Sequence, residues 1–83
     1  MKLRDGIAVT STEYGGVLLD QRAGSYWQLN DSGTVVITAL ADGLGPEAAV
    51  ERLLAAFDVD RTQAEADVAA LTRQLLDAKM ATP

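Results

Sequence analysis

The stretch that decides the fold runs from residue 25 to residue 37 and reads SYWQLNDSGTVVI. Its first five residues alternate between two faces, as the side chains of a β-strand do. After Asn30 the apolar residues recur at helical spacing, and Asn30 itself suits a helix N-cap because its side-chain oxygen can accept an unpaired backbone N–H. This single change of period predicts strands before residue 30 and helices after it.

Two further strands are predicted on the N-terminal side of this stretch. Residues 7–12 alternate apolar and hydroxyl side chains, and residues 17–21 follow the turn Tyr14-Gly15-Gly16, whose glycines can adopt positive φ. A four-residue connector, 21–24, has the length and glycine placement of a hairpin loop leading into 25–29. Tight connectors between three strands predict an antiparallel meander with 25–29 on an edge.

Three helices are predicted on the C-terminal side. The first ends at residues 42–45, and its apolar stripe is Val36, Ile37, Leu40 and Leu44. The second begins at Pro46, a favoured first helical residue, and its stripe is Val50, Leu53, Leu54 and Phe57. The third follows Asp60 and Gln63, read as a capping-box variant, and its stripe is Ala64, Val68, Leu71, Leu75 and Ala78, flanked by Leu76 and Met80.

Composition narrows the possible functions. The 83 residues allow one domain, and 48% hydrophobic with 23% charged residues is typical of a globular protein. A net charge of −5 disfavours binding to nucleic acid or to anionic membranes. Because the chain has no cysteine and no histidine, it lacks the commonest general base and zinc ligands. We therefore expect no catalysis, metal or cofactor. Without a signal peptide or a long apolar run, we expect a cytoplasmic location.

The edge strand 25–29 is the candidate binding element. Its outward N–H and C=O groups have no predicted partner, and no lysine, proline or inward charge protects them from pairing with another strand. Such an edge can accept an extended peptide by β-augmentation. A row on the third helix, Asp67, Leu71 and Gln74, could form the opposite wall of a cleft. Trp27 and Leu29 could equally be plain core residues beneath the helices.

Several stretches together resemble the PqqD-like family, also called RiPP recognition elements. They are EYGGVLLD at 13–20, GSYWQLN at 24–30, Gly33, Asp67-Val68, Leu71 and Leu75. The resemblance covers nearly the whole chain, so residues 1–83 are expected to form a single peptide-binding domain. The size of the chain and residues 26–30 are most similar to the stand-alone members of lasso peptide biosynthesis.

This resemblance implies an α+β, winged helix-turn-helix-like fold with a three-stranded antiparallel sheet followed by three helices. It also implies that the leader of a ribosomally made precursor peptide adds antiparallel to the third strand, against the third helix. By position, the strand wall would be Tyr26, Trp27, Gln28 and Leu29, and the helix wall Asp67, Val68, Leu71, Gln74 and Leu75. The implied partners are the precursor leader, a leader peptidase and an ATP-dependent lasso cyclase. The family often has glycine where Lys79-Met80 stands, so the end of the third helix is not fixed by the resemblance.

Three alternatives are weighed against leader binding. A winged-helix DNA-binding domain would place the third helix in a groove, but residues 60–80 carry three basic and four acidic residues. An enzyme could use paired carboxylates, but pairs such as Glu65 and Asp67 are two residues apart and do not share a helical face. The serines have no histidine to activate them. The third alternative is a homodimer formed through the free edge of the third strand, and the sequence is compatible with it.

Overall fold

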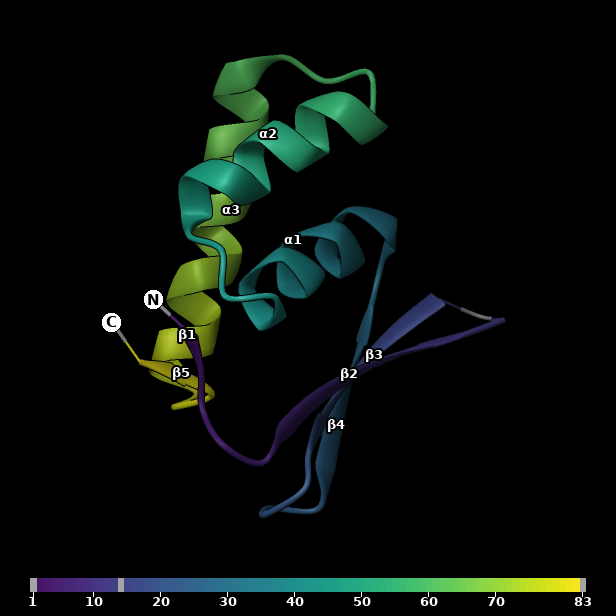
Figure 1. Cartoon of the computed structure of the whole chain (residues 1–83), viewed down its shortest axis with the longest axis vertical. Helices are drawn as coiled ribbons and strands as arrows, with labels where there is room; N and C mark the ends of the chain where they lie inside the picture. The colour runs from purple at the N-terminus through teal and green to yellow at the C-terminus, as the bar shows by residue number, and fades with distance from the viewer. Residues whose placement is uncertain (1, 14, 83) are drawn as a thin grey trace.

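A three-stranded antiparallel sheet followed by three helices forms the body of the molecule (Figure 1). The computed structural model describes residues 2–13 and 15–82. The sheet has the order β2-β3-β4, with β2 at Ile7–Thr12, β3 at Gly15–Asp20 and β4 at Ser25–Leu29. The helices are α1 at Asp31–Ala41, α2 at Pro46–Ala56 and α3 at Arg61–Asp77. The predicted α+β architecture is confirmed, including the bounds of the first and third strands of the sheet.

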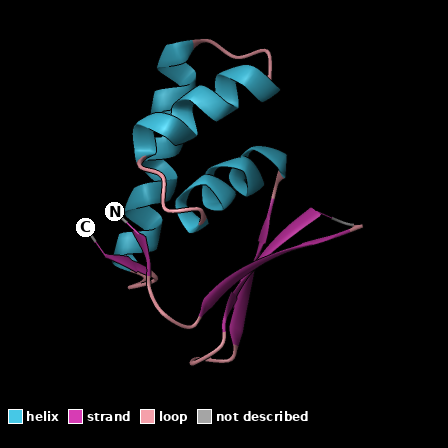
Figure 2. Cartoon of the chain, viewed as in Figure 1, coloured by secondary structure: helices cyan, strands magenta, loops and turns pink. Residues whose placement is uncertain are grey.

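A second, two-stranded sheet joins the two ends of the chain and was not predicted. Strand β1, Lys2–Leu3, pairs antiparallel with β5, Ala81–Thr82. Figure 2 shows this small sheet beside the C-terminal end of α3, apart from the larger one. Both strands have only two residues, which is too short for any alternation to be visible in the sequence.

The middle strand begins and ends earlier than predicted. We expected 17–21, but Gly15 and Gly16 already pair with Thr12 and Ser11, and Gln21 lies in the following turn. Position 16 requires glycine because α1 passes directly over the strand there: a Cβ would overlap the side chain of Thr34. The predicted turn also included Tyr14, which lies outside the described residues.

Local side-chain caps begin two of the helices as predicted. Asn30 Oδ1 accepts the backbone N–H of Gly33 at 2.7 Å, and Asp60 Oδ1 accepts that of Gln63 at 2.7 Å. Only half of the predicted capping box forms, however, because the Gln63 amide donates to Asp67 instead. The second and third helices are also shorter than their predicted apolar stripes. Phe57, predicted in the stripe of the second helix, is the C-cap of α2. Ala78, predicted in the stripe of the third, is the exposed C-cap of α3.

The hydrophobic core lies where the helices meet each other and the sheet. α1 contacts both the sheet and α2, and α2 contacts α3. The largest fully buried side chains come from β3 and all three helices: Leu18, Val36, Ile37, Leu40, Leu53, Val68 and Leu75. Because α3 packs on α2 rather than directly on the larger sheet, a space is left between α3 and the edge strand β4.

Candidate functional site

A cleft of about 500 Å³ lies between the C-terminal half of β4 and the middle of α3. Its strand side is formed by Trp27, Gln28 and Leu29, and its helix side by Asp67, Ala70, Leu71 and Gln74. The end of β4 and the other two helices complete the lining with Asn30, Ser32, Gly33, Val36 and Leu53. Asp67 is the one charged residue in this lining, so the cleft is mostly apolar and amide in character.

The strand side of the cleft is an open sheet edge. β4 is the last strand in the order β2-β3-β4, and within residues 2–13 and 15–82 no other strand pairs with its outer side. In an antiparallel ladder alternate residues direct their N–H and C=O groups away from the neighbouring strand. The cleft therefore offers main-chain donors and acceptors along one wall and side chains along the other.

Six of the nine predicted site residues line this cleft. They are Trp27, Gln28, Leu29, Asp67, Leu71 and Gln74. The structure thus brings the two predicted walls together, although the binding role of these residues stays a prediction.

The other three predicted residues lie outside the cleft. Val68 and Leu75 are 2% and 0% exposed and belong to the hydrophobic core. The family resemblance assigned them to the helix wall by position, but the apolar stripe that they share with Leu71 runs from the core to the cleft, and they lie on its core side. Tyr26 is 68% exposed and lies on the open surface of β4 beside the cleft.

Sequence reasoning missed the lining residues that come from other elements. Leu53 and Val36 reach the cleft from α2 and α1, and no local pattern distinguishes them from ordinary core residues. Ala70 could have been found, since Asp67, Ala70, Leu71 and Gln74 have the i, i+3, i+4, i+7 spacing of one helical face.

The carboxylate of Asp67 is held in place by its own helix. Gln63 Nε2, one turn earlier, donates to Asp67 Oδ1 at 2.8 Å. This hydrogen bond leaves the second carboxylate oxygen as an acceptor in the cleft. Asp67 therefore offers a positioned negative charge at the helix wall.

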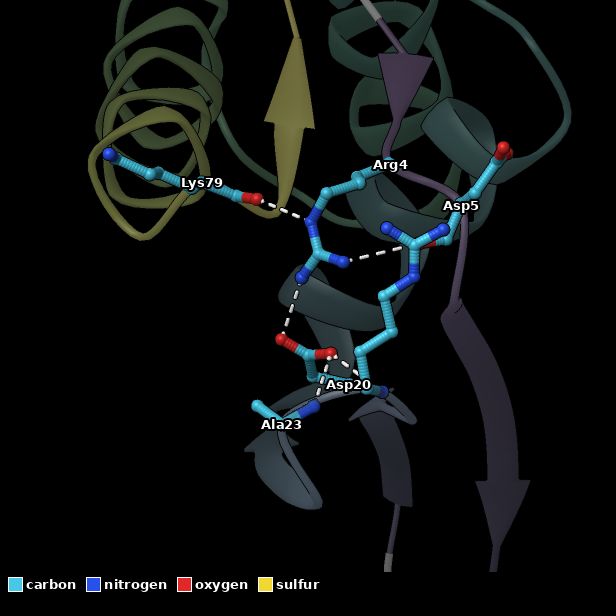
Figure 3. Close-up of polar contacts among 6 residues, drawn as sticks. Arg4, Asp5, Asp20, Ala23 and Lys79 are labelled. Atoms are coloured by element: carbon cyan, nitrogen blue, oxygen red, sulfur yellow. Dashed lines mark hydrogen bonds and ion pairs between the residues drawn. The ribbon is translucent and has the colours of Figure 1, made fainter.

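A group of polar contacts outside the cleft joins the end of β3 to the residues that follow α3 (Figure 3). Arg4 donates from Nη2 to Asp20 Oδ2 at 2.7 Å and from Nε to the carbonyl of Lys79 at 2.7 Å. Asp20 ends β3, just before the hairpin to β4, and Lys79 follows the end of α3. We call Arg4, Asp20 and Lys79 the clamp, because they link the β3–β4 hairpin to the C-terminal end of α3.

Asp20 is the buried anchor of the clamp, at 6% exposure. Its other oxygen accepts the backbone N–H groups of Arg22 and Ala23, both at 3.1 Å. The Ala23 N–H, and after it the Arg4 charge, lower the pKa of the Asp20 carboxyl from its usual value, against the opposing effect of burial. The carboxylate thus fixes both the hairpin turn and the N-terminal segment.

The end of α3 is also unusual in its backbone. Lys79 has φ 60, the left-handed conformation that glycine adopts most easily. The Met80 N–H bonds to the Leu75 carbonyl and the Lys79 N–H to that of Leu76, which is the Schellman pattern of a helix end. α1 ends in the same way with Gly43 at φ 84. The helix end left open by the sequence therefore falls at Asp77, and Lys79 occupies a position suited to glycine.

Two features are absent from the part of the chain that the structure describes. No group of three or more His, Cys, Asp or Glu side chains among them is arranged to hold a metal ion. Within residues 2–13 and 15–82, no helix combines the length and apolar character needed to cross a lipid bilayer.

Two solved structures are similar to this chain over nearly its whole length. One, described as lasso peptide synthetase B1 complexed with the leader peptide, is 45% identical, with a TM-score of 0.83 over 99% of this chain and 96% of that chain. The other, TbiB1 in complex with the TbiA(beta) leader peptide, is 29% identical, with a TM-score of 0.84 over 96% of this chain and 93% of that chain. Comparison with curated proteins gives no match.

A family model gives the assignment. Residues 15–81 match the model of coenzyme PQQ synthesis protein D (PqqD). These residues include β3, β4, all three helices and the clamp residues Asp20 and Lys79. The resemblance seen in the sequence is thereby confirmed, and the protein belongs to the PqqD family.

Proposed function

We propose that this protein binds the leader segment of a ribosomally synthesised precursor peptide, of the lasso class, by strand addition to β4. The observation that carries the proposal is the unpaired edge of β4 facing α3 across the cleft. The two similar solved structures, whose descriptions name leader peptides in complex, support the same function.

The leader would add antiparallel to β4 and extend the sheet to four strands. The existing strands are all antiparallel, and antiparallel pairing is the slightly more stable ladder. Main-chain hydrogen bonds to β4 would provide affinity with little demand on leader sequence. Every second leader side chain would point toward α3, because side chains alternate along a strand.

The helix wall would select the leader side chains that enter the cleft. Leu71, together with Leu53 and Trp27, offers an apolar surface, while Gln74 and Asp67 offer hydrogen-bonding groups. Burial of one aliphatic or aromatic leader side chain on this surface contributes on the order of 1.5–3 kcal/mol. Tyr26, outside the cleft, would contact the leader only at its margin.

The proposed role is binding without catalysis, in a single cytoplasmic domain. By holding the leader, the protein would raise the effective concentration of the precursor near a leader peptidase and an ATP-dependent cyclase. Tethering of this kind makes the second encounter intramolecular and strengthens it without new contacts.

A titration tests the proposal directly. The probe is a fluorescently labelled synthetic leader of a lasso peptide precursor, followed by its anisotropy and by Trp27 emission. We expect saturable one-to-one binding, protection of the β4 amides from hydrogen exchange, and a loss of a few fold in affinity for Tyr26→Ala.

Two outcomes would contradict the proposal. Failure of the folded protein to bind at tens of micromolar leader would exclude leader recognition. Binding without protection of β4 amides would exclude strand addition. Concentration-dependent sedimentation of the free protein would instead indicate that the edge of β4 pairs with a second copy.

A further inference from the structure

The cleft continues past the end of β4 into a second hollow of about 390 Å³. Both hollows are lined by Asn30, Ser32, Leu53 and Asp67. Because they share these four residues, the two hollows form one groove that runs from β4 across the start of α1. We call the second hollow the extension; its remaining lining residues are Asp31, Phe57 and Val59.

The extension has an apolar floor and an acidic rim. Leu53, Phe57 and Val59 form the floor, and Val59 is 37% exposed. Asp31 and Asp67 are both exposed, and within the described part of the chain neither forms an ion pair with a basic side chain. Among the residues that the structure describes, no lysine or arginine lines the cleft or the extension.

The direction of strand addition decides which part of the leader reaches the extension. β4 runs from Ser25 to Leu29, and the extension lies beyond its Leu29 end. A strand antiparallel to β4 enters at the Leu29 end and leaves at the Ser25 end. The leader residues that precede the paired segment therefore pass over the extension.

We infer that the extension binds the leader residues immediately N-terminal to the strand-forming segment, and that it selects a basic side chain there next to an apolar one. The inference rests on the proposed function and specifies its ligand. The apolar side chain would cover Leu53, Phe57 and Val59, and the basic one would lie between the carboxylates of Asp31 and Asp67.

The electrostatic preference is expected to be moderate. Ion pairs at exposed sites contribute roughly 0.2–1 kcal/mol, since water screens them and the long side chain loses freedom. The positive end of the α1 dipole partly offsets Asp31, which lies in the first turn of that helix. The net charge of −5 on the whole protein also favours a basic leader side chain over an acidic one.

The test is a panel of synthetic leaders that differ only in charge. Hydrogen exchange first maps the leader residues that pair with β4. Each of the four or so residues before that segment is then replaced in turn by Lys, Gln or Glu, and affinity is measured by anisotropy at low salt. At one or two positions we expect Lys to bind about fivefold more tightly than Glu, with Gln between them.

Matched variants assign the preference to the extension. The double change Asp31→Asn with Asp67→Asn should remove the difference between Lys and Glu leaders. The control double change Glu65→Gln with Asp77→Asn alters the charge equally on the α2 side of α3 and should keep the difference. About 1 M salt should also abolish it.

The outcomes separate this inference from the proposed function. If all leader charge variants bound the wild-type protein with equal affinity, the inference about the extension would be overturned, while leader binding itself would stand. A preference that survives the Asp31 and Asp67 changes, or that appears after the paired segment rather than before it, would also overturn it. Absence of binding by every leader would overturn the proposed function itself.

Discussion

Besides the cleft against β4, α3 borders a second hollow on its α2 side, and these two hollows differ in size and in chemistry. The larger, about 1150 Å³, lies between α2 and α3 and has six charged residues in its lining: Glu47, Glu51, Arg61, Glu65, Arg73 and Asp77. The smaller of these two is the cleft, of about 500 Å³, which lies between β4 and α3 and has Asp67 as the one charged residue among its described lining residues. An ion pair between Arg61 and Glu51, at 3.0 Å, crosses one end of the larger hollow.

Volume alone therefore does not identify a site for an extended peptide. Both walls of the larger hollow are helices, whose main-chain groups are bonded within each helix except in the first turn. This hollow has no strand edge to which an extended peptide could add. The smaller hollow has a strand edge as one wall, and unpaired main-chain groups are what an extended peptide needs.

The largest expected effect comes from a core residue of α3, the helix that borders both hollows. Leu75 is 0% exposed and anchors α3 in the core. Leu75→Ala should lower the free energy of unfolding by about 2–5 kcal/mol, because it leaves a cavity in a small core. Urea unfolding measures this change. The neighbouring Leu76→Ala, at a site 36% exposed, is the control and should cost clearly less; equal losses would show that α3 is anchored differently.

The next effect separates the two hollows. Leu71→Asp places a charge in the cleft and should weaken leader binding at least tenfold, or by about 1.4 kcal/mol. Leu76→Asp places the same charge in the hollow between α2 and α3 and should leave affinity within about twofold. Anisotropy titrations measure both, with circular dichroism to show that each variant is folded. The reverse order of affinities would move the peptide site to the larger hollow.

A smaller effect concerns the clamp, which links the β3–β4 hairpin to the C-terminal end of α3. The lowered pKa of Asp20 means that the unfolded chain binds more protons than the folded one just below pH 4. The stability due to this carboxylate is therefore fully present above about pH 4 and is lost as the pH falls through the lowered pKa. Asp20→Asn should be less stable at neutral pH and should lose less stability on acidification.

Thermal melts of both proteins between about pH 6 and pH 3 measure this difference. Asp42→Asn is the control, because its ion pair with Arg52 is exposed and long, at 3.3 Å. Parallel pH dependence of Asp20→Asn and the wild type would exclude Asp20 as the titrating anchor.

The smallest effect is a gain of stability away from both hollows. Lys79→Gly should stabilise the fold by about 0.5–1 kcal/mol, because relief of the left-handed conformation outweighs the added freedom of the unfolded chain. Leader affinity should not change, since the Lys79 carbonyl that accepts Arg4 is kept. Gly43→Ala at the equivalent end of α1 is the converse test and should destabilise the fold. A loss of stability in Lys79→Gly would contradict the helix end described above.

Much of the fold was predictable because its signals are local. The alternation in 7–12 and 25–29, the caps at Asn30 and Asp60, and Pro46 at a helix start all depend on neighbours within a few residues. The pairing of β1 with β5 was not predictable. It joins residues about eighty positions apart through two-residue strands, and nothing in either segment alone marks the other as its partner.

The candidate site was predictable only in part, for a geometric reason. The period of α3 placed Val68, Leu71 and Leu75 on one stripe, but could not tell where that stripe turns from the core to the cleft. This boundary depends on how α2 packs against α3. The same packing brings Leu53 into the cleft, and no spacing within α2 indicates it.

The joining of the chain ends by β1, β5 and the clamp also bears on the order of folding during synthesis. β2, β3, β4 and the first two helices contact neighbours close in sequence and can assemble while the rest is still being made. Arg4 cannot meet the carbonyl of Lys79 until α3 and the turn after it have left the ribosome. Closing so long a loop is slow, so the clamp forms after the sheet and the first two helices. The open edge of β4 would thus be present in the nascent chain before α3 lies opposite it.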